Sequence, residues 1–395
     1  MRKKTNGNSK NNGAIVIGGH FQGLGAIRAL AHEHVHVALV DSEPCIARTS
    51  RYICRYFRSP QISNETDYLK FFIDLAEHHG LHGWVLFPTD DETVYFLSKH
   101  HSKLSEYFKL ITPPWETTQF VYNKKKTYQL AEKMGLPIPK TWYPENESDL
   151  DQIDHFPLII KPAVMRSFYK KTKEKVFCAN NRQQLIENYR KAADVIPADE
   201  ILIQERLSNV TENLFSYCPV IFQDKILGRI VAKRPRQHPM DFGKASTYAI
   251  TVQCEPIELL GNRFLKAINY YGLGEVEFIY DENLGEYKLL EVNPRIWGWH
   301  TIALKAGVNI CHLTHCGIQG EFNYRIGYQY DTKWIRLLTD VPVVISEIAK
   351  GNLSLKEYAS TLQGKKEWAV WSLSDPLPFF TELLLLPYLM IKRGY

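Results

Sequence analysis

The sequence predicts an α/β protein that begins with a parallel-sheet domain of the dinucleotide-binding type. Residues 14–41 read as strand, glycine-rich turn, helix and strand, which is the order of a β-α-β unit. Residues 274–293 read as two strands joined by a polar, glycine-containing turn, which predicts a β-hairpin far from the first unit. The chain has 395 residues, 45% of them hydrophobic and 23% charged, which is enough for two or three domains with cores of their own.

The composition excludes several classes of protein. The net charge of +5 suits anionic substrates such as nucleotides and carboxylates, and it does not imply nucleic acid binding. The seven cysteines are scattered singly, which argues against a disulfide framework or a zinc site and favours a reducing, cytoplasmic location. Residues 1–12 are polar and basic with no apolar core, so we interpret them as a disordered tail rather than a signal peptide.

The first β-α-β unit begins with a short buried strand, Ala14–Ile17. The glycine-rich turn at residues 18–25 leads into a helix expected to begin near Ala26, and the next strand covers residues 35–41. A lone glycine-rich turn is a weak signal, and its spacing fits poorly with an oxidoreductase that binds a ribose through Asp41. His20 in this turn either contacts a substrate or has a packing role.

A later strand of the first domain, at residues 84–88, is followed by a helix. Asp90, Asp91 and Glu92 crowd the start of that helix, where the macrodipole stabilises negative charge. We therefore favour a capping role for them over the positioning of a substrate amine at the carboxyl end of the sheet. Arg51 is a possible carboxylate anchor in the same cleft.

Carboxylate and amide side chains gather on the predicted hairpin. Side chains two apart on a strand share a face, so Glu291 and Asn293 point the same way, and Arg295 follows the strand end marked by Pro294. Folding the hairpin brings Glu277 roughly opposite Glu291, and two carboxylates so close need a cation between them. The pattern favours a magnesium–nucleotide site. The alternative is a surface hairpin on which Glu291 pairs with Arg295 and Glu277 faces solvent.

These motifs, with others before them, resemble the ATP-grasp superfamily, of the type that joins a carboxylate to an amine. The resemblance runs from about Gly13 to about Gly307, and several motifs in the family's order are more specific than any one alone. It also implies that the N-terminal dinucleotide-like domain binds no dinucleotide. The matching segments are residues 123–126 at a helix start, 135–141, 157–162, 201–207, and the Glu-x-Asn-x-Arg segment at 291–295.

The resemblance implies roles for particular residues. Lys124 and Lys161 would contact the phosphates, although either lysine following Lys124 is an alternative to it. The strand at residues 201–207 would read adenine, and Glu212 would bond the ribose. The expected cofactors are ATP and Mg²⁺ or Mn²⁺. The implied nucleotide-binding set is Lys124, Lys161, Gln204, Glu205, Leu207 and Glu212, and the implied metal ligands are Glu277, Glu291 and Asn293.

Two further segments, residues 163–176 and residues 228–239, are rich in lysine and arginine. Many family members have a glycine-rich loop after the second phosphate strand, whereas residues 163–176 contain no glycine. This stretch is either a basic loop that covers phosphate or a basic hairpin that never meets it. Residues 228–239 form a strand followed by a proline-broken loop, and Lys233 and Arg234 are candidates to neutralise an acyl phosphate, as Arg295 is. The alternative is a basic surface loop.

The resemblance implies an enzyme that phosphorylates a small-molecule carboxylate with ATP and joins it to an amine, with amino acids or peptides as the expected substrates. An acceptor other than an amine, or a non-catalytic nucleotide-binding module, are the alternatives. The apolar stretch 379–391 is too short to span a bilayer and favours a docked terminal helix over one lying on a membrane. The oligomeric state is not indicated. The expected parts are a tail at 1–12, a first domain at 13–120, a nucleotide lid at 121–205, a core at 206–330 and a helical extension at 331–395.

Overall fold

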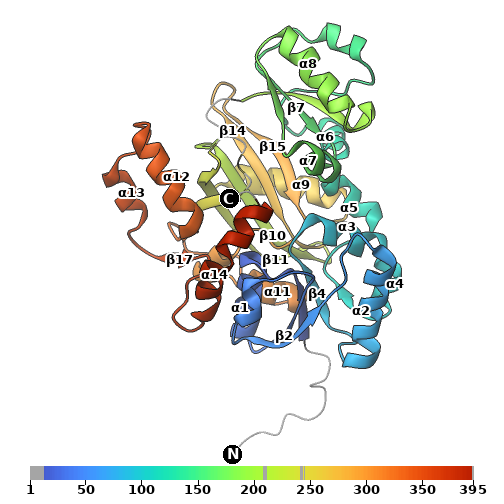
Figure 1. Cartoon of the computed structure of the whole chain (residues 1–395), viewed down its shortest axis with the longest axis vertical. Coiled ribbons are helices and arrows are strands. Elements are labelled where there is room, and N and C mark those ends of the chain that lie inside the picture. Colours follow the sequence, from blue (N-terminus) through green and yellow to red (C-terminus); the bar gives the residue numbers. More distant parts are fainter. Residues whose placement is uncertain (1–12, 208–210, 241–242, 244, 394–395) are drawn as a thin grey trace, which may run out of the picture.

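The computed structural model describes residues 13–207, 211–240, 243 and 245–393, without the side chains of Arg166, Ser167 and Arg393. The predicted tail at residues 1–12 lies outside the described residues. The described chain contains three sheets, with the small sheet at the top of the view and the first parallel sheet at the bottom (Figure 1).

The first sheet is parallel throughout and has the strand order β3-β2-β1-β4-β5, so the predicted parallel-sheet domain is confirmed. β1 is buried along its whole length because it lies in the middle of this sheet. The strands are β1 Gly13–Ile17, β2 His36–Asp41, β3 Ile53–Arg58, β4 Val85–Pro88 and β5 Lys109–Leu110. The helices are α1 Phe21–His32, η1 Ile46–Thr49, α2 Glu65–His79, α3 Asp91–Lys99 and α4 His101–Ser105.

The start of α1 differs from the prediction. The helix begins at Phe21 rather than near Ala26, because the turn needs only Gly18 and Gly19. Gly18 has φ +97°, in the region that favours glycine. Gly23 lies inside the helix, where a Cβ would approach the Gly18 carbonyl oxygen to 1.9 Å. The glycines that suggested a long turn therefore allow the helix to pack closely against that turn.

The small sheet is antiparallel, in the order β6-β9-β7-β8, and has a hydrophobic core of its own. Its elements are β6 Thr141–Trp142, η2 Glu147–Gln152, β7 Leu158–Pro162, α7 Met165–Thr172, β8 Phe177–Ala179, α8 Arg182–Ala193, η3 Ala198–Glu200 and β9 Ile201–Glu205. The expectation of a loop or hairpin at 163–176 was wrong, because α7 occupies its centre. Phe168 on α7 is completely buried in the small core, and this packing stabilises the helix despite its flanking lysines.

The large sheet has eight strands, in the order β15-β14-β10-β11-β12-β16-β17, with β13 beside β10. Its described pairs are antiparallel except for the parallel pair β16–β17. The strands are β10 Leu214–Phe222, β11 Lys225–His238, β12 Ala245–Thr251, β13 Gly272–Leu273, β14 Glu275–Asp281, β15 Glu286–Asn293, β16 Lys333–Ile335 and β17 Lys366–Trp368. The accompanying helices are α5 Trp115–Tyr122, α6 Lys124–Lys133, α9 Glu255–Ala267, α10 Thr301–Lys305 and α11 Ile310–Gly317.

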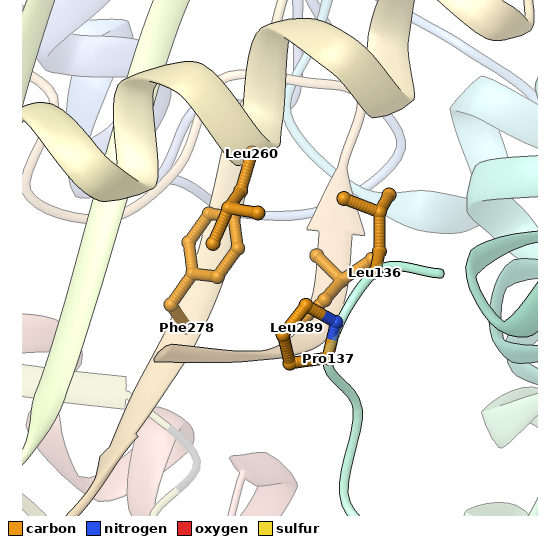
Figure 2. A pocket seen from close by; sticks show the side chains of 5 residues that line it. All are labelled: Leu136, Pro137, Leu260, Phe278 and Leu289. Atoms are coloured by element: carbon orange, nitrogen blue, oxygen red, sulfur yellow. The ribbon is translucent and has the colours of Figure 1, made fainter. Parts of the chain in front are cut away.

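The two faces of the large sheet pack differently. One face carries α9, and there Leu260 lies over Phe278 while Pro137 lies beside Leu289, around a small apolar pocket (Figure 2). The other face shares one continuous hydrophobic core with the first domain, which includes Leu24 and Trp297. The first domain is therefore fixed against the large sheet by apolar packing.

The C-terminal segment contributes more than the predicted helices. Its helices are α12 Leu337–Ala349, α13 Leu355–Thr361 and α14 Leu377–Arg393, but β16 and β17 also extend the large sheet. A buried bidentate ion pair joins Arg236 of β11 to Asp340 of α12 at 2.8 and 2.9 Å. The sequence did not reveal these strands because each has only three residues, too few for an alternating pattern to show.

Candidate functional site

The predicted hairpin is present and has the predicted register. β14 and β15 are antiparallel, with Glu277 directly opposite Glu291 and Glu275 opposite Asn293. Asn293 also bridges the strands, since its Nδ2 lies 2.8 Å from Glu277 and 3.1 Å from Glu275. The hairpin thus places carboxylate and amide groups together on the face opposite Phe278 and Leu289.

Cations from three separate parts of the chain meet these oxygens. Lys124, the first residue of α6, donates to the Glu291 carboxylate, and Arg234 of β11 donates to Glu277. Arg234 also lies 3.7 Å from Glu275. Arg295, just after β15, lies 3.3 Å from the Asn293 Oδ1. Topology rather than sequence proximity therefore assembles the cluster, which we call the hairpin cluster: Glu275, Glu277, Glu291, Asn293, Lys124, Arg234 and Arg295.

Only one of the three consecutive lysines reaches the hairpin cluster. Asn123 caps α6, which directs the Lys124 side chain back toward β15. Lys125 donates to the backbone oxygen of Asp199 at 2.9 Å, and Lys126 donates to Gln119. Of the three lysines, Lys124 is therefore the one that contacts the hairpin carboxylates, and its role toward phosphate stays a prediction.

Burial and neighbouring charges shift the pKa values of several groups in the cluster. Burial raises the pKa of Glu291, but the adjacent Lys124 outweighs burial and holds that pKa at about 2. Burial lowers the pKa of Lys124, yet attraction to Glu291 leaves it above its usual value. Burial, reinforced by repulsion from Glu277, raises the pKa of Glu275 to about 7. The cluster therefore combines Glu291, which stays ionised, with Glu275, whose ionised form is disfavoured by burial and by the charge of Glu277.

A further basic residue lies near the cluster, on the small sheet. Lys161 of β7 is buried and donates to the Tyr128 hydroxyl and to the Gln204 Oε1, both at 2.7 Å. The Tyr128 hydroxyl donates in turn to the Leu290 carbonyl at 2.6 Å. Burial, with repulsion from Lys124, lowers the pKa of Lys161 to about 7. Tyr128 thus links the two sheets at this point.

Comparisons with known proteins agree with this geometry. The family described as the ATP-binding domain of the carbamoyl-phosphate synthase L chain matches residues 250–315, which include the hairpin. The solved L-amino acid ligase from Bacillus licheniformis has a TM-score of 0.61 at 16% identity, over 80% of this chain and 78% of that ligase. The biotin carboxylase domain of Hydrogenobacter thermophilus 2-oxoglutarate carboxylase, solved with MgADP and bicarbonate, has a TM-score of 0.63 at 17% identity, over 81% and 73%.

The chain has the ATP-grasp fold. The D-aspartate ligase of Enterococcus faecium is 23% identical over 223 residues, which are 54% of this chain and 53% of that ligase. The chain thus spans about half the length of this curated relative.

The remaining residues that the ATP-grasp resemblance implied are more dispersed. Gln204 and Glu205 end β9, where Glu205 accepts from Lys288 at 2.7 Å and from the Lys140 backbone at 2.9 Å. Leu207 follows β9 and is partly buried, and Glu212 is exposed in the turn before β10. These positions remain predictions for adenine and ribose.

Lys233 and Arg234 are neighbours on β11 but do not share an environment. The Lys233 ammonium lies 5.6 Å from the centre of the Phe215 ring, whereas Arg234 is buried against the hairpin carboxylates. Adjacent strand residues point to opposite faces, so only one of the two can reach the cluster from β11. The structure brings Arg234 to the site and leaves Lys233 on the other face.

Residues of the first domain also reach this ATP-grasp site. Asp90 caps α3 through the Thr93 backbone at 2.8 Å, as favoured, but Asp91 binds Arg295 at 2.6 Å. Arg51 lies elsewhere, with its backbone bonded to Asp375 beside α14. Among the cations of 163–176, Lys175 contributes to the low pKa of Glu291.

Sequence reasoning missed one buried member of the cluster. Glu275 is 3% exposed and accepts from Ser216 at 2.9 Å and from Trp299 at 3.1 Å. Its position two residues before Glu277, on the same strand face, was the signal that could have identified it. Tyr128, one helical turn after Lys124, carried a weaker signal because a tyrosine at that spacing is usually a core residue.

Proposed function

We propose that this chain is an ATP-dependent carboxylate–amine ligase that works through an acyl phosphate. A substrate carboxylate oxygen attacks the γ-phosphorus of ATP, and the bond from that phosphorus to ADP breaks. An amine nitrogen then attacks the acyl carbon, phosphate leaves with the carboxylate oxygen, and the amine loses a proton. The similarity to a D-aspartate ligase and an L-amino acid ligase supports an amino acid or a peptide among the substrates.

The observation that carries this proposal is the pair of facing glutamates with a cation on each. Glu277 and Glu291 oppose each other across β14 and β15, while Arg234 and Lys124 neutralise them. Phosphoryl transfer needs little covalent chemistry from the protein, and depends on positioning and on neutralising charge. This arrangement supplies both in one partly buried place.

The oxygens present fit a magnesium or manganese ion. Among the described residues, no three His, Cys, Asp or Glu side chains gather in a way that would hold a metal by themselves. Glu277, Glu291 and Asn293 instead form a set of two carboxylates and one amide, all hard oxygen donors on one face of adjacent strands. Such a set suits an ion that also takes oxygens from phosphates, as the MgADP bound to the carboxylase neighbour illustrates for that protein. When bound, the ion would neutralise phosphate charge.

The residues of the site bind the phosphates, the nucleoside and the substrate carboxylate. Lys124 and Lys161 bind the phosphates as compact point charges, and Arg295 stabilises charge that develops during transfer. Gln204, Glu205 and Leu207 place adenine at the end of β9, and Glu212 bonds the ribose. Arg234 anchors the substrate carboxylate or its acyl phosphate, and its contact with Glu277 keeps the guanidinium in place meanwhile.

The test uses amino acids and peptides whose carboxylates carry ¹⁸O. Each acid is incubated with Mg–ATP and a panel of amines, and phosphate release and its ¹⁸O content are measured. The proposal predicts that ATP is split only with a suitable acid, and that one ¹⁸O passes to phosphate per amide formed. Transfer of ¹⁸O without an amine requirement would point to another acceptor, and tight ATP binding that no acid turns into phosphate release would favour a regulatory module.

A further inference from the structure

The last helix, α14, is apolar on its outward side as well as on its inward side, where Leu389 is buried and Phe379 and Leu385 pack against the core. Exposed apolar residues are spread along it, with Leu384 81% exposed and Ile391 89% exposed. At 100° per residue these positions fall within an arc of about 140°, so they form one continuous stripe. We call this stripe the α14 face: Leu377, Phe380, Leu383, Leu384, Pro387, Met390 and Ile391.

The polar side chains of α14 face the protein. Glu382 is buried and accepts from Arg336 at 2.9 Å. Thr381 lies 2.8 Å from Thr49, and the Tyr388 hydroxyl donates to Glu43 at 3.1 Å. These contacts dock α14 against the first domain, where it crosses the molecule as the red helix in the foreground (Figure 1). The α14 face is therefore held outward by specific polar bonds and is not a loosely attached end.

The exposed charges beside α14 are mainly positive, with Glu43 as an acidic neighbour near the end of the helix. Glu382 is the sole acidic residue of α14, and it is 2% exposed. Arg48 on η1 and Arg51 are exposed beside α14, whereas Lys392 is paired with Glu43. Arg51 reaches the backbone of Ser374, beside Leu373, which is 87% exposed. An apolar stripe with a cationic border is complementary to an anionic lipid surface.

We propose that the α14 face lies in the interface of a membrane that contains anionic lipid. A helix of 17 residues is about 25 Å long, and none of the described helices has the length and apolar content to cross a bilayer. The helix therefore lies flat, with its stripe among the acyl chains and its cations at the phosphates. Pairing with a second copy is less favourable, because a two-fold contact would bring the cationic borders together. This proposal is independent of the reaction that the chain catalyses.

The direct test is co-sedimentation of the full chain with vesicles of phosphatidylcholine alone or with 30% phosphatidylglycerol, at low and high salt. We expect binding to the anionic vesicles that weakens at high salt. Leu384→Glu/Ile391→Glu should lower the bound fraction at least tenfold, whereas Leu284→Glu/Leu355→Glu should bind like the unchanged chain. Leu284 and Leu355 are 66% and 73% exposed and lie away from α14, so they control for the added charge.

Three outcomes would overturn the proposal. They are equal binding by both double variants, no binding of the unchanged chain to either vesicle, and a dimer in lipid-free buffer that only the α14 variant dissociates. The last result, read by analytical ultracentrifugation, would assign the face to a second copy. Thermal unfolding of both double variants checks that they remain folded. Arg48→Glu/Arg51→Glu should also weaken binding to anionic vesicles while leaving the apolar stripe intact.

Discussion

Arg234 and Arg236 lie two residues apart on β11, and both form buried ion pairs, yet the two pairs have different surroundings. Arg236 meets Asp340 in a bidentate pair, and Thr247 donates to the same carboxylate at 2.7 Å. Arg234 instead faces two carboxylates, Glu275 and Glu277, and it cannot match both with one charge. In the Arg236–Asp340 pair, one positive charge meets one negative charge and both side chains have their hydrogen bonds. Arg234, in contrast, carries one charge against the two carboxylates of Glu275 and Glu277.

This difference suggests how to tell a structural ion pair from a functional one in this fold. A structural pair satisfies both partners in full, so that no ligand is needed. A functional cluster keeps like charges together in a buried place: burial, reinforced by a like charge, raises the pKa of Glu275 and lowers the pKa of Lys161. Substitutions in the first kind should reduce stability, and substitutions in the second should reduce activity.

The largest effect is expected at the balanced pair. Asp340→Ala leaves the Arg236 guanidinium buried without its carboxylate, which typically costs about 3–5 kcal/mol of folding free energy. Urea unfolding followed by circular dichroism measures this loss. Arg236→Met/Asp340→Leu removes both charges and should lose much less. If Asp340→Ala unfolds at the same urea concentration as the unchanged chain, the pair does not stabilise the extension.

The next effect should appear mainly in activity. Glu291→Gln keeps the size of the side chain but removes a charge that we assign to the metal and to Lys124. Turnover should fall roughly 10²–10³-fold, the scale of losing one preorganised electrostatic contact. The urea midpoint should fall less than in Asp340→Ala, because the amide still accepts from Lys124, although the stability that the low pKa of Glu291 reflects is lost with the charge. Near-normal phosphate release by folded Glu291→Gln protein would remove Glu291 from the metal site.

A good part of the site could be predicted because its motifs are local. The strands that carry Glu277, Glu291 and Lys161 each show their pattern within about seven residues, and alternation alone places Glu291 and Asn293 on one face. The order of β1, α1 and β2 was equally readable from apolar runs and glycines.

The remainder depends on partners far away in the sequence. The helical state of α7 requires Phe168 to reach a core made by other elements of the small sheet. Arg234 could not be separated from Lys233 without knowing which face of β11 meets the hairpin. The Arg295–Asp91 contact joins residues 204 positions apart, and no local sequence pattern indicates it.

Lys233 and Arg234, which the sequence alone could not distinguish, provide a matched pair of variants. Arg234→Ala should weaken use of the substrate carboxylate by about 1.5–3 kcal/mol, the range for a hydrogen bond to a charged group. Lys233→Ala removes an equal charge from the opposite face and should stay close to normal. The ratio kcat/KM for the carboxylate measures both, and circular dichroism confirms folding. Equal losses in the two variants would mean that the strand, and not the Arg234 contact, matters for this step.

The smallest effect concerns a proton at Lys161. Its pKa is lowered to about 7, so the side chain is largely neutral at pH 8 and largely charged at pH 6. Phosphates favour the charged ammonium and raise that pKa, so nucleotide binding should draw in a proton, and more of one as the pH rises from 6 to 8. At pH 7.5 a pKa near 7 implies an uptake of roughly three-quarters of a proton.

Calorimetry in buffers of different ionisation enthalpy counts this proton directly, with a non-hydrolysable ATP analogue and Mg²⁺. Lys161→Arg is the matched control, because a guanidinium stays charged at every pH in the range and cannot take up a proton on binding. Any proton that the nucleotide itself gains is common to both proteins and cancels in the difference. An unchanged proton count in Lys161→Arg would show that Lys161 is already charged before ATP arrives. The contacts of Lys161 with Tyr128 and Gln204 would then be structural, like the ion pair of Arg236 with Asp340.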